Sequence, residues 1–200
     1  MNTTRTTATA AAAAIALASA ALLSGCGIQS IPAGDNAVAA AWSEVENQYQ
    51  RRADLVPNLV EAVKGYAAHE RETLEAVVQA RANATSVQVS ANDLTPEKLE
   101  KFEAAQGQLR SALGRLLAVA EAYPQLKANE NFRDLQAQLE GTENRIATAR
   151  RRYIEAVQSF NDLVTVPPSS WTNSMFYKKQ PKAQFQATAP DAAKPPAVKF

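Results

Sequence analysis

Residues 131–165 decide the fold, and they read NFRDLQAQLEGTENRIATARRRYIEAVQSFNDLVT. Apolar or small residues recur here every seven positions, and again three positions after each, which is the a/d pattern of a helical seam. The first set is Phe132, Leu139, Ile146, Tyr153 and Phe160, and the second is Leu135, Thr142, Ala149, Ala156 and Leu163. Because a helix must bury its apolar stripe against other elements, the pattern predicts a bundle of helices.

A second helix is marked by its start and its end. Thr95, Pro96 and Glu97 supply an N-cap, a proline in the first turn and an acid at the positive end of the helix dipole. Leucine-rich sequence follows as far as Pro124, and the residue before a proline disfavours helical backbone. The polar and β-branched residues 85–94 are therefore expected to form the preceding loop.

The first helical region covers residues 36 to about 84 and is interrupted by Pro57. Proline inside a helix costs about 3 kcal/mol, so we expect either a kink or a new helix start capped by Asp54. Few glycines and many Ala, Leu, Glu, Gln and Arg residues favour helix throughout. The prediction is an all-α fold: an antiparallel three- to four-helix bundle with a long, proline-kinked first helix and a disordered C-terminal tail.

Residues 1–25 have the layout of an export signal, with Arg5, an apolar run of residues 10–23 and small residues before Cys26. The apolar run is shorter than the roughly 20 residues that a membrane-spanning helix needs. Residues 23–26, Leu-Ser-Gly-Cys, resemble a bacterial lipobox, in which the cysteine receives acyl chains such as palmitate. Cys26 is the only cysteine, so it has no disulfide partner within the chain, and lipidation explains an exported thiol. The alternative is an ordinary secretory signal in which Cys26 occurs by chance.

The bundle, residues 36–168, is expected to lie between two irregular segments. Residues 26–35 carry Gly, Ser, Pro and Asn without periodicity and are interpreted as a flexible tether. Residues 169–200 hold an aromatic patch followed by a basic tail rich in Pro, Ala and Lys, interpreted as disordered. Without the signal the chain has 20 basic and 20 acidic residues, and the lysines of the tail leave the bundle mildly acidic.

The aromatic patch has two interpretations. Trp171, Phe176 and Tyr177 either fold back over the end of the bundle or lie in a membrane interface, where aromatic rings are favoured. Lys178 and Lys179 follow directly and favour contact with anionic lipid. These five residues are the candidates for a membrane interface.

Charged residues on the helices also allow two interpretations. Arg52 shares a seven-residue stripe with apolar positions, while Glu143 and Arg150 flank the seam of the last helix. Either these groups form interhelical ion pairs that fix the register, or they line a partner-binding face together with Arg51 and Asp54. The sequence leaves both alternatives open.

No enzymatic chemistry is expected. His69 is the only histidine, and the Glu-x-x-His spacing of di-metal bundles is absent because Tyr66 occupies the glutamate position. The sequence has no phosphate loop, dinucleotide fingerprint or nucleophile elbow. We therefore expect no catalytic residue, metal, cofactor or small-molecule substrate. The acidic bundle also argues against nucleic-acid binding.

Several motifs resemble the LemA family of bacterial envelope proteins. They are RRADLVPNLV at 51–60, LEGTENRI at 139–146 and ARR at 149–151, with further matches at Gly65-Tyr66, His69-Glu70, Asn161 and Pro167. Ile154 and Phe160 depart from the family pattern, which more often has Asn and Tyr. The lipobox departs as well, since most members carry an N-terminal hydrophobic helix. The resemblance implies a helical bundle outside the cytoplasmic membrane and little about mechanism.

The expected function is that of a lipid-anchored, non-catalytic adaptor for an unidentified envelope protein. The alternative is a structural protein whose aromatic patch and tail bind the membrane or wall surface. No aspartate follows Cys26, and in Gram-negative lipoproteins an aspartate there would favour retention in the inner membrane. We therefore expect a periplasm-facing protein, attached to the outer membrane if the cell is Gram-negative.

Overall fold

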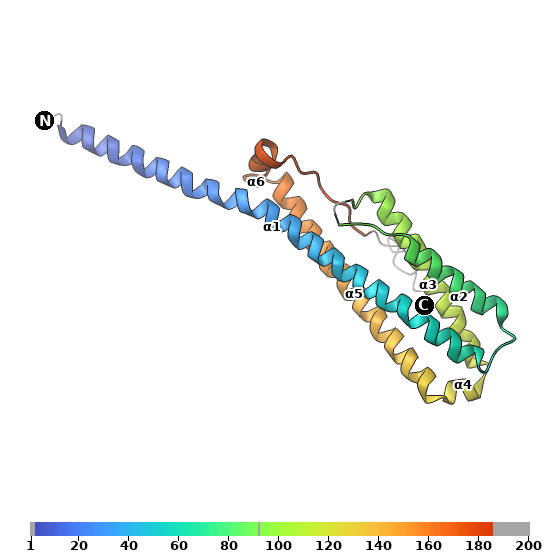
Figure 1. The fold of residues 1–200 in the computed structure, drawn as a ribbon. Helices are drawn as coiled ribbons and strands as arrows, with labels where there is room; N and C mark the ends of the chain where they lie inside the picture. The colour runs from blue at the N-terminus through green and yellow to red at the C-terminus, as the bar shows by residue number, and fades with distance from the viewer. Residues whose placement is uncertain (1–2, 92, 186–200) are drawn as a thin grey trace, which may run out of the picture. The chain divides into compact units, whose positions relative to one another are not determined.

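Figure 1 shows the chain as a computed structural model, which describes residues 3–91 and 93–185, with side chains from residue 28 onward. All regular secondary structure in this part of the chain is helical, which confirms the predicted all-α class. The long helices are α1 Thr3–Lys64, α2 Arg71–Ser86, α3 Pro96–Glu121 and α5 Glu130–Thr165, and the short ones are α4 Pro124–Ala128, α6 Ser169–Thr172 and the π-helix η1 Asn173–Tyr177. No helix among the described residues combines the length and the hydropathy needed to cross a membrane.

The chain divides into two compact units. Unit 1 comprises Met1–Ala40 with Glu155–Lys182, and unit 2 comprises Ala41–Ile154 with Ala183–Phe200. In unit 2, α2 and α3 lie beside the adjoining parts of α1 and α5, so four antiparallel helices enclose one core (Figure 1). Its fully buried side chains include Trp42, Leu59, Leu109, Leu116, Phe132 and Tyr153.

The predicted signals at the two ends of α3 are confirmed. The Thr95 side chain accepts a hydrogen bond from the Lys98 amide at 3.3 Å, and Pro96 occupies the first helical position. Helix α3 ends shortly before Pro124, which begins α4. Local sequence is sufficient here because a cap satisfies the first backbone donors of its own helix.

Pro57 does not end the first helix, so of the two predicted alternatives the new helix start capped by Asp54 is wrong. Helix α1 continues past both residues, and the chain leaves the helical conformation only over residues 65–70. Asp54 is exposed within the helix, ten residues before its end, where it accepts a hydrogen bond from Gln50 at 2.7 Å. Buried apolar side chains on both sides of Pro57 stabilise the helix through packing, which outweighs the local preference.

The seam of α5 follows the predicted positions as far as Tyr153, after which one of its two sets of residues moves by one position. Beyond that point the buried apolar residues are Val157, Phe160 and Val164, while Ala156 and Leu163 are only partly buried. A straight α-helix drifts by about 20° per heptad against a strict seven-residue repeat. Over five heptads the drift amounts to about one residue, so Val157 and Val164 replace Ala156 and Leu163 in the seam, while Phe160 stays buried at its predicted position.

Residues 28–35 are helical, so the prediction of a flexible tether is wrong for them. They belong to α1, Ile31 is fully buried, and a Cβ added at Gly34 would lie 2.9 Å from Leu163 Cδ1 of α5. Composition alone suggested flexibility, whereas close packing against α5 stabilises the helix. The predicted lipidation site falls just before this segment, and the side chain of Cys26 lies outside the described residues.

The prediction of a disordered tail is wrong for residues 178–185. The Asn161 side chain donates to the Lys182 carbonyl at 3.0 Å and accepts from the Lys182 amide at 2.7 Å. Asn173 holds the backbone of Lys179 in the same way, with both distances 2.9 Å. Two side-chain amides thus supply the backbone hydrogen bonds that this proline- and lysine-rich segment cannot make locally. The rest of the tail prediction, residues 186–200, lies outside the described residues.

Candidate functional site

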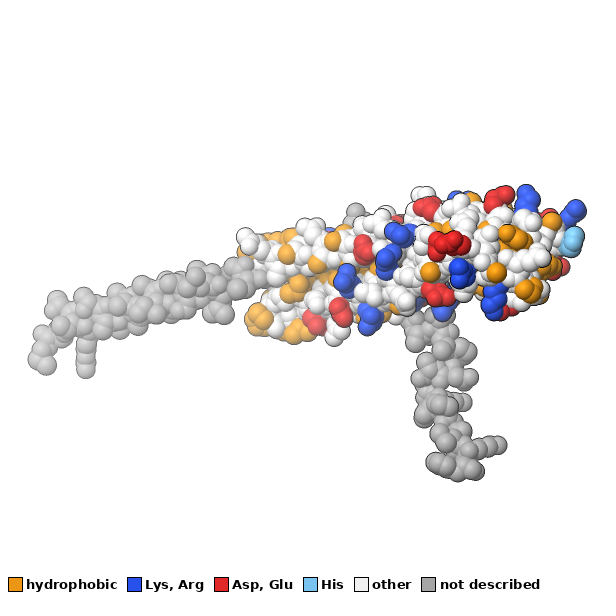
Figure 2. Space-filling model, turned by 90° about the horizontal axis from the view of Figure 1, so that it is seen from below, with side chains coloured by type: hydrophobic (Ala, Val, Ile, Leu, Met, Phe, Trp, Pro, Cys, Tyr) orange, Lys and Arg blue, Asp and Glu red, His pale blue; other side chains and the backbone are white. Residues whose placement is uncertain are grey.

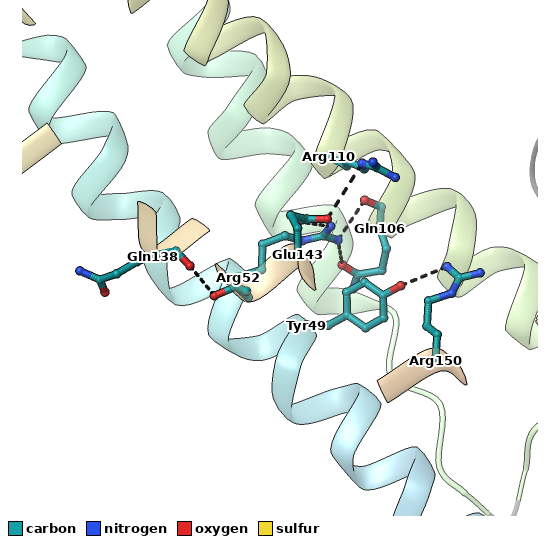
Figure 3. A network of polar contacts seen from close by, with 8 residues as sticks. Tyr49, Arg52, Gln106, Arg110, Gln138, Glu143 and Arg150 are labelled. Atoms are coloured by element: carbon teal, nitrogen blue, oxygen red, sulfur yellow. Dashed lines mark hydrogen bonds and ion pairs between the residues drawn. The ribbon is translucent and has the colours of Figure 1, made fainter. Parts of the chain in front are cut away.

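A groove with a volume of about 620 Å³ opens between α1, α3 and α5 in unit 2. Polar contacts join its floor to its walls (Figure 3). The charged residues that line it are Arg52, Glu103, Arg110, Glu143, Arg150 and Arg151. Four arginines against two glutamates give the groove an excess of positive charge, and we name it the arginine groove.

Arg52 forms the floor of the arginine groove and links three helices. Its side chain is 2% exposed, and its Nη1 donates to Glu143 Oε1 of α5 at 3.0 Å. Its Nη2 donates to both oxygens of Gln106 in α3, at 3.0 Å for the carbonyl and 2.6 Å for Oε1 (Figure 3). The Gln106 amide in turn donates to the Ala84 carbonyl of α2 at 3.2 Å. A buried guanidinium needs such partners, and this set fixes the register of all four helices.

Arg150 forms a second ion pair, on the wall of the arginine groove. Its Nη2 donates to Glu103 Oε1 at 2.5 Å, and its Nη1 donates to the Tyr49 hydroxyl at 3.3 Å. The guanidinium also lies 4.1 Å from the centre of the Phe185 ring, within the range of a cation–π contact. Burial opposes the charge of Arg150, but Tyr49 and Glu103 together raise the pKa of the guanidinium.

An aromatic cluster packs against this wall. The rings of Trp42, Tyr49, Phe102, Tyr153 and Phe185 lie with their centroids 5.0 to 6.0 Å apart. The buried ends of the cluster have hydrogen-bond partners, since the Trp42 indole donates to the Val89 carbonyl at 2.7 Å and the Tyr153 hydroxyl donates to the Ala183 carbonyl at 2.8 Å. Burial raises the pKa of Tyr153 to about 12, so this hydroxyl remains a donor at neutral pH.

Two arginines stand at the rim of the groove with their guanidinium groups exposed. The Arg110 side chain is 77% exposed, and its Nε lies 4.0 Å from Glu143 Oε2. Arg151 is also exposed, one residue after Arg150, whose ion pair is partly buried. Each guanidinium presents a planar set of donors that fits a carboxylate in a bidentate manner. The groove is therefore suited to binding carboxylates and other anions.

The structure brings together three of the five residues predicted for a partner face. Arg52, Glu143 and Arg150 line the groove, whereas Arg51 and Asp54 are exposed and are not part of its lining. The predicted face did not include the other polar lining residues, which are Tyr49, Glu103, Gln106, Arg110, Asn144 and Arg151. A signal existed for Gln106, which lies four residues after Phe102 and three before Leu109 and so places a polar group on the buried stripe of α3.

The residues predicted for a membrane interface all lie in unit 1. Trp171 and Phe176 are 67% and 64% exposed, so the interpretation that these rings fold back over the bundle is wrong. Tyr177 instead donates from its hydroxyl to the Ile28 carbonyl of α1 at 2.6 Å. Lys178 is exposed, and Lys179 pairs with Asp35 at 2.8 Å.

Outside the arginine groove, the part of the chain that the structure describes shows neither a metal site nor an extended basic surface on the face drawn in Figure 2. His69 is exposed in the turn between α1 and α2. Among residues 3–91 and 93–185, no three His, Cys, Asp or Glu side chains gather in a way that could hold a metal ion. On the face drawn in Figure 2, acidic and basic side chains alternate. This face therefore offers no extended basic surface of the kind that binds nucleic acid.

Comparison with known proteins gives a consistent family assignment. The model of the LemA family matches residues 41–200. The chain is 33% identical to the magnetosome protein MamQ 2 of Paramagnetospirillum magneticum over 81 residues, which are 40% of this chain and 29% of that protein. It is 26% identical to the protein LemA of Metamycoplasma hominis over 143 residues, which are 72% of this chain and 60% of that protein. The matches thus span less than two thirds of either relative, but the family model covers most of this chain, which belongs to the LemA family.

Proposed function

We propose that this protein is a lipid-anchored, non-catalytic adaptor that binds an acidic segment of another envelope protein in the arginine groove. The observation that carries the proposal is the excess of guanidinium groups in an open groove, with Arg110 and Arg151 exposed at its rim. Exposed arginines beside a concave surface favour carboxylate partners, because the guanidinium fork matches a carboxylate.

The buried contacts beneath the rim support a binding role. Arg52 and Arg150 are held by ion pairs and hydrogen bonds from several helices, so the groove keeps its shape without a ligand. A surface that is already ordered loses less conformational entropy when a partner binds. The same pairing supports a non-catalytic role, because Glu143 and Glu103 are each held by an arginine and neither is paired with a nucleophile.

The anchor is the second part of the proposal. The lipobox-like residues 23–26 make Cys26 the attachment point, and two or three acyl chains would hold the protein stably at a membrane. The bundle would then face the periplasm, from the outer membrane in a Gram-negative cell. Labelling cells with a palmitate analogue tests this directly. The wild type should carry the label and Cys26→Ser should not; a label that persists in the variant would contradict the anchor.

The groove is tested by crosslinking in native membranes, affinity purification and mass spectrometry. Arg110→Glu with Arg151→Glu reverses the rim charge. Because Arg110 also lies 4.0 Å from Glu143, the partner of Arg52, urea denaturation checks that the variant keeps its fold. Arg133→Glu with Arg145→Glu makes the same double change at exposed positions of α5 outside the groove and serves as the matched control. We expect one envelope protein to be recovered with the wild type and the control, and to be lost with the rim variant.

The reciprocal experiment establishes the chemistry of the partner. Replacing the acidic residues of its crosslinked segment with amides should reduce recovery to the level seen with the rim variant. If the wild type and the rim variant recover the same proteins in the same amounts, the arginine groove is not the partner site.

A further inference from the structure

Exposed apolar side chains gather in unit 1. Among the described residues, five of the seven exposed large hydrophobic side chains belong to this unit. Three of them lie on α6 and η1, where Trp171, Met175 and Phe176 are 67%, 72% and 64% exposed. The other two are Ile28 and Val166, at 46% and 52%. Apolar groups gathered in this way mark an interaction surface, whereas scattered single ones need no explanation.

A direct contact ties this surface to the N-terminal helix. The Tyr177 hydroxyl donates to the Ile28 carbonyl at 2.6 Å, so the end of η1 rests on residue 28 of α1. Residue 28 is only two positions after Cys26, and two residues of chain span at most about 7 Å. The interfacial layer of a bilayer is roughly 5 to 8 Å thick on each side. A lipid attached at Cys26 would therefore bring α6 and η1 to the depth of the lipid head groups.

The charge next to the apolar residues matches a membrane surface that carries anionic lipid. Lys178, Lys179 and Lys182 follow η1, and Asp35 is the acid that pairs with the last two of them. Three lysines against one aspartate leave this segment positive. Basic residues beside an apolar surface are attracted to anionic head groups.

We propose that α6 and η1 form a second membrane contact, in which Trp171, Met175 and Phe176 insert into the interface of an anionic bilayer. Tryptophan is favoured at this depth because its ring is apolar and its indole N–H can still donate a hydrogen bond. The proposal rests on the proposed lipid anchor, since a lipid at Cys26 is what brings α6 and η1 close to the membrane. An acyl anchor alone would leave the bundle free to rotate, whereas the second contact fixes the orientation of unit 1 on the membrane.

Tryptophan fluorescence can test the contact in the intact lipidated chain. The chain has two tryptophans, of which Trp42 is fully buried and Trp171 is exposed. The protein is reconstituted in vesicles of phosphatidylcholine and phosphatidylglycerol in equal parts, with ordinary or brominated acyl chains. Brominated lipid should quench the emission of Trp171, which is the part of the signal that is lost in Trp171→Phe. The emission of Trp171→Phe, which comes from Trp42, should be the same in both vesicles.

A charged variant with a matched control shows whether the apolar residues hold the contact. Met175→Asp with Phe176→Asp should abolish the quenching of Trp171, while Val78→Asp, at an exposed position of α2, should leave it unchanged. All three positions are more than half exposed, so these changes should not disturb folding. Quenching that persists in the double variant would contradict the inference.

Flotation of the same vesicles separates this inference from the anchor. A chain that floats with the vesicles while Trp171 escapes quenching retains the anchor and overturns the second contact. A chain that remains at the bottom of the gradient overturns both the anchor and the contact.

Discussion

Aromatic side chains face inward in unit 2 and outward in unit 1. The rings of Trp42, Phe102 and Tyr153 pack against one another in unit 2, and the indole of Trp42 has a backbone partner. In unit 1, Trp171 and Phe176 are largely exposed. Charges show the opposite distribution, because the ion pair of Arg52 is at the core of unit 2 whereas Lys179 pairs with Asp35 near the surface of unit 1. The two units thus use similar residues differently: in unit 2 they stabilise the bundle, and in unit 1 they are available for contact.

The largest effect is expected at the buried charge of unit 2. Arg52→Ala removes the partner of Glu143 and Gln106 and should lower the free energy of unfolding by about 4 kcal/mol, since breaking a buried pair leaves a polar group without compensation. Arg51→Ala, at the exposed neighbouring position, should change it by less than about 0.5 kcal/mol. Urea denaturation of both variants measures the difference. Equal effects would contradict the assigned role of Arg52.

The next effect compares an inward ring with an outward one. Phe185 is 7% exposed between Arg150 and the rings of Trp42 and Tyr153. Phe185→Ala should destabilise the protein by about 3 kcal/mol, as expected for a buried phenylalanine. Phe176→Ala, made at a ring that is 64% exposed, should stay within about 0.5 kcal/mol of the wild type. Thermal or urea denaturation measures both variants. A larger loss of stability in Phe176→Ala than in Phe185→Ala would contradict the difference between the units.

A smaller loss of stability is expected when the side-chain amide of Asn173 is removed, since this amide is hydrogen-bonded to the chain that follows η1. Asn173→Ala removes hydrogen bonds to the Val164 and Lys179 carbonyls and from the Lys179 amide, and should cost about 2 kcal/mol. Hydrogen exchange provides the local measurement, in which the Lys179 amide should lose its protection. The exposed Asn58 offers a matched control, and Asn58→Ala should leave that protection unchanged.

The smallest effect is a dependence of stability on pH in unit 1. Burial alone would raise the pKa of Asp35, but hydrogen bonds from Lys179 and Lys182 outweigh it and lower the pKa from its ordinary value of 3.8. Asp35 therefore contributes stability that is fully present above pH 3.8 and is lost as the pH falls through the lowered pKa. Urea titrations of the wild type and Asp35→Asn should differ by a constant amount at neutral pH and converge in acid. A difference that grows in acid would contradict the pairing.

The sequence by itself determined the class of fold and much of the bundle. The seam of residues 131–165 specified α5, and the cap at Thr95 together with Pro124 specified the bounds of α3. The candidate site could be predicted only in part: Arg52 stood on an apolar stripe, which favoured an interhelical ion pair or a partner-binding face without deciding between them. These features depend on neighbours within a turn or two of the same helix, and such contacts can be read from spacing.

Only the tertiary structure decided which distant groups meet. Arg52 and Glu143 are 91 residues apart, and Tyr177 contacts the carbonyl of a residue 149 positions earlier. The order of residues 28–35 and 178–185 likewise comes from α5 and from two asparagines, against a local composition that favours loops. The physical reason is that backbone hydrogen bonds and apolar surface can be satisfied by any part of the chain that packing brings near, whereas local propensity counts only adjacent residues.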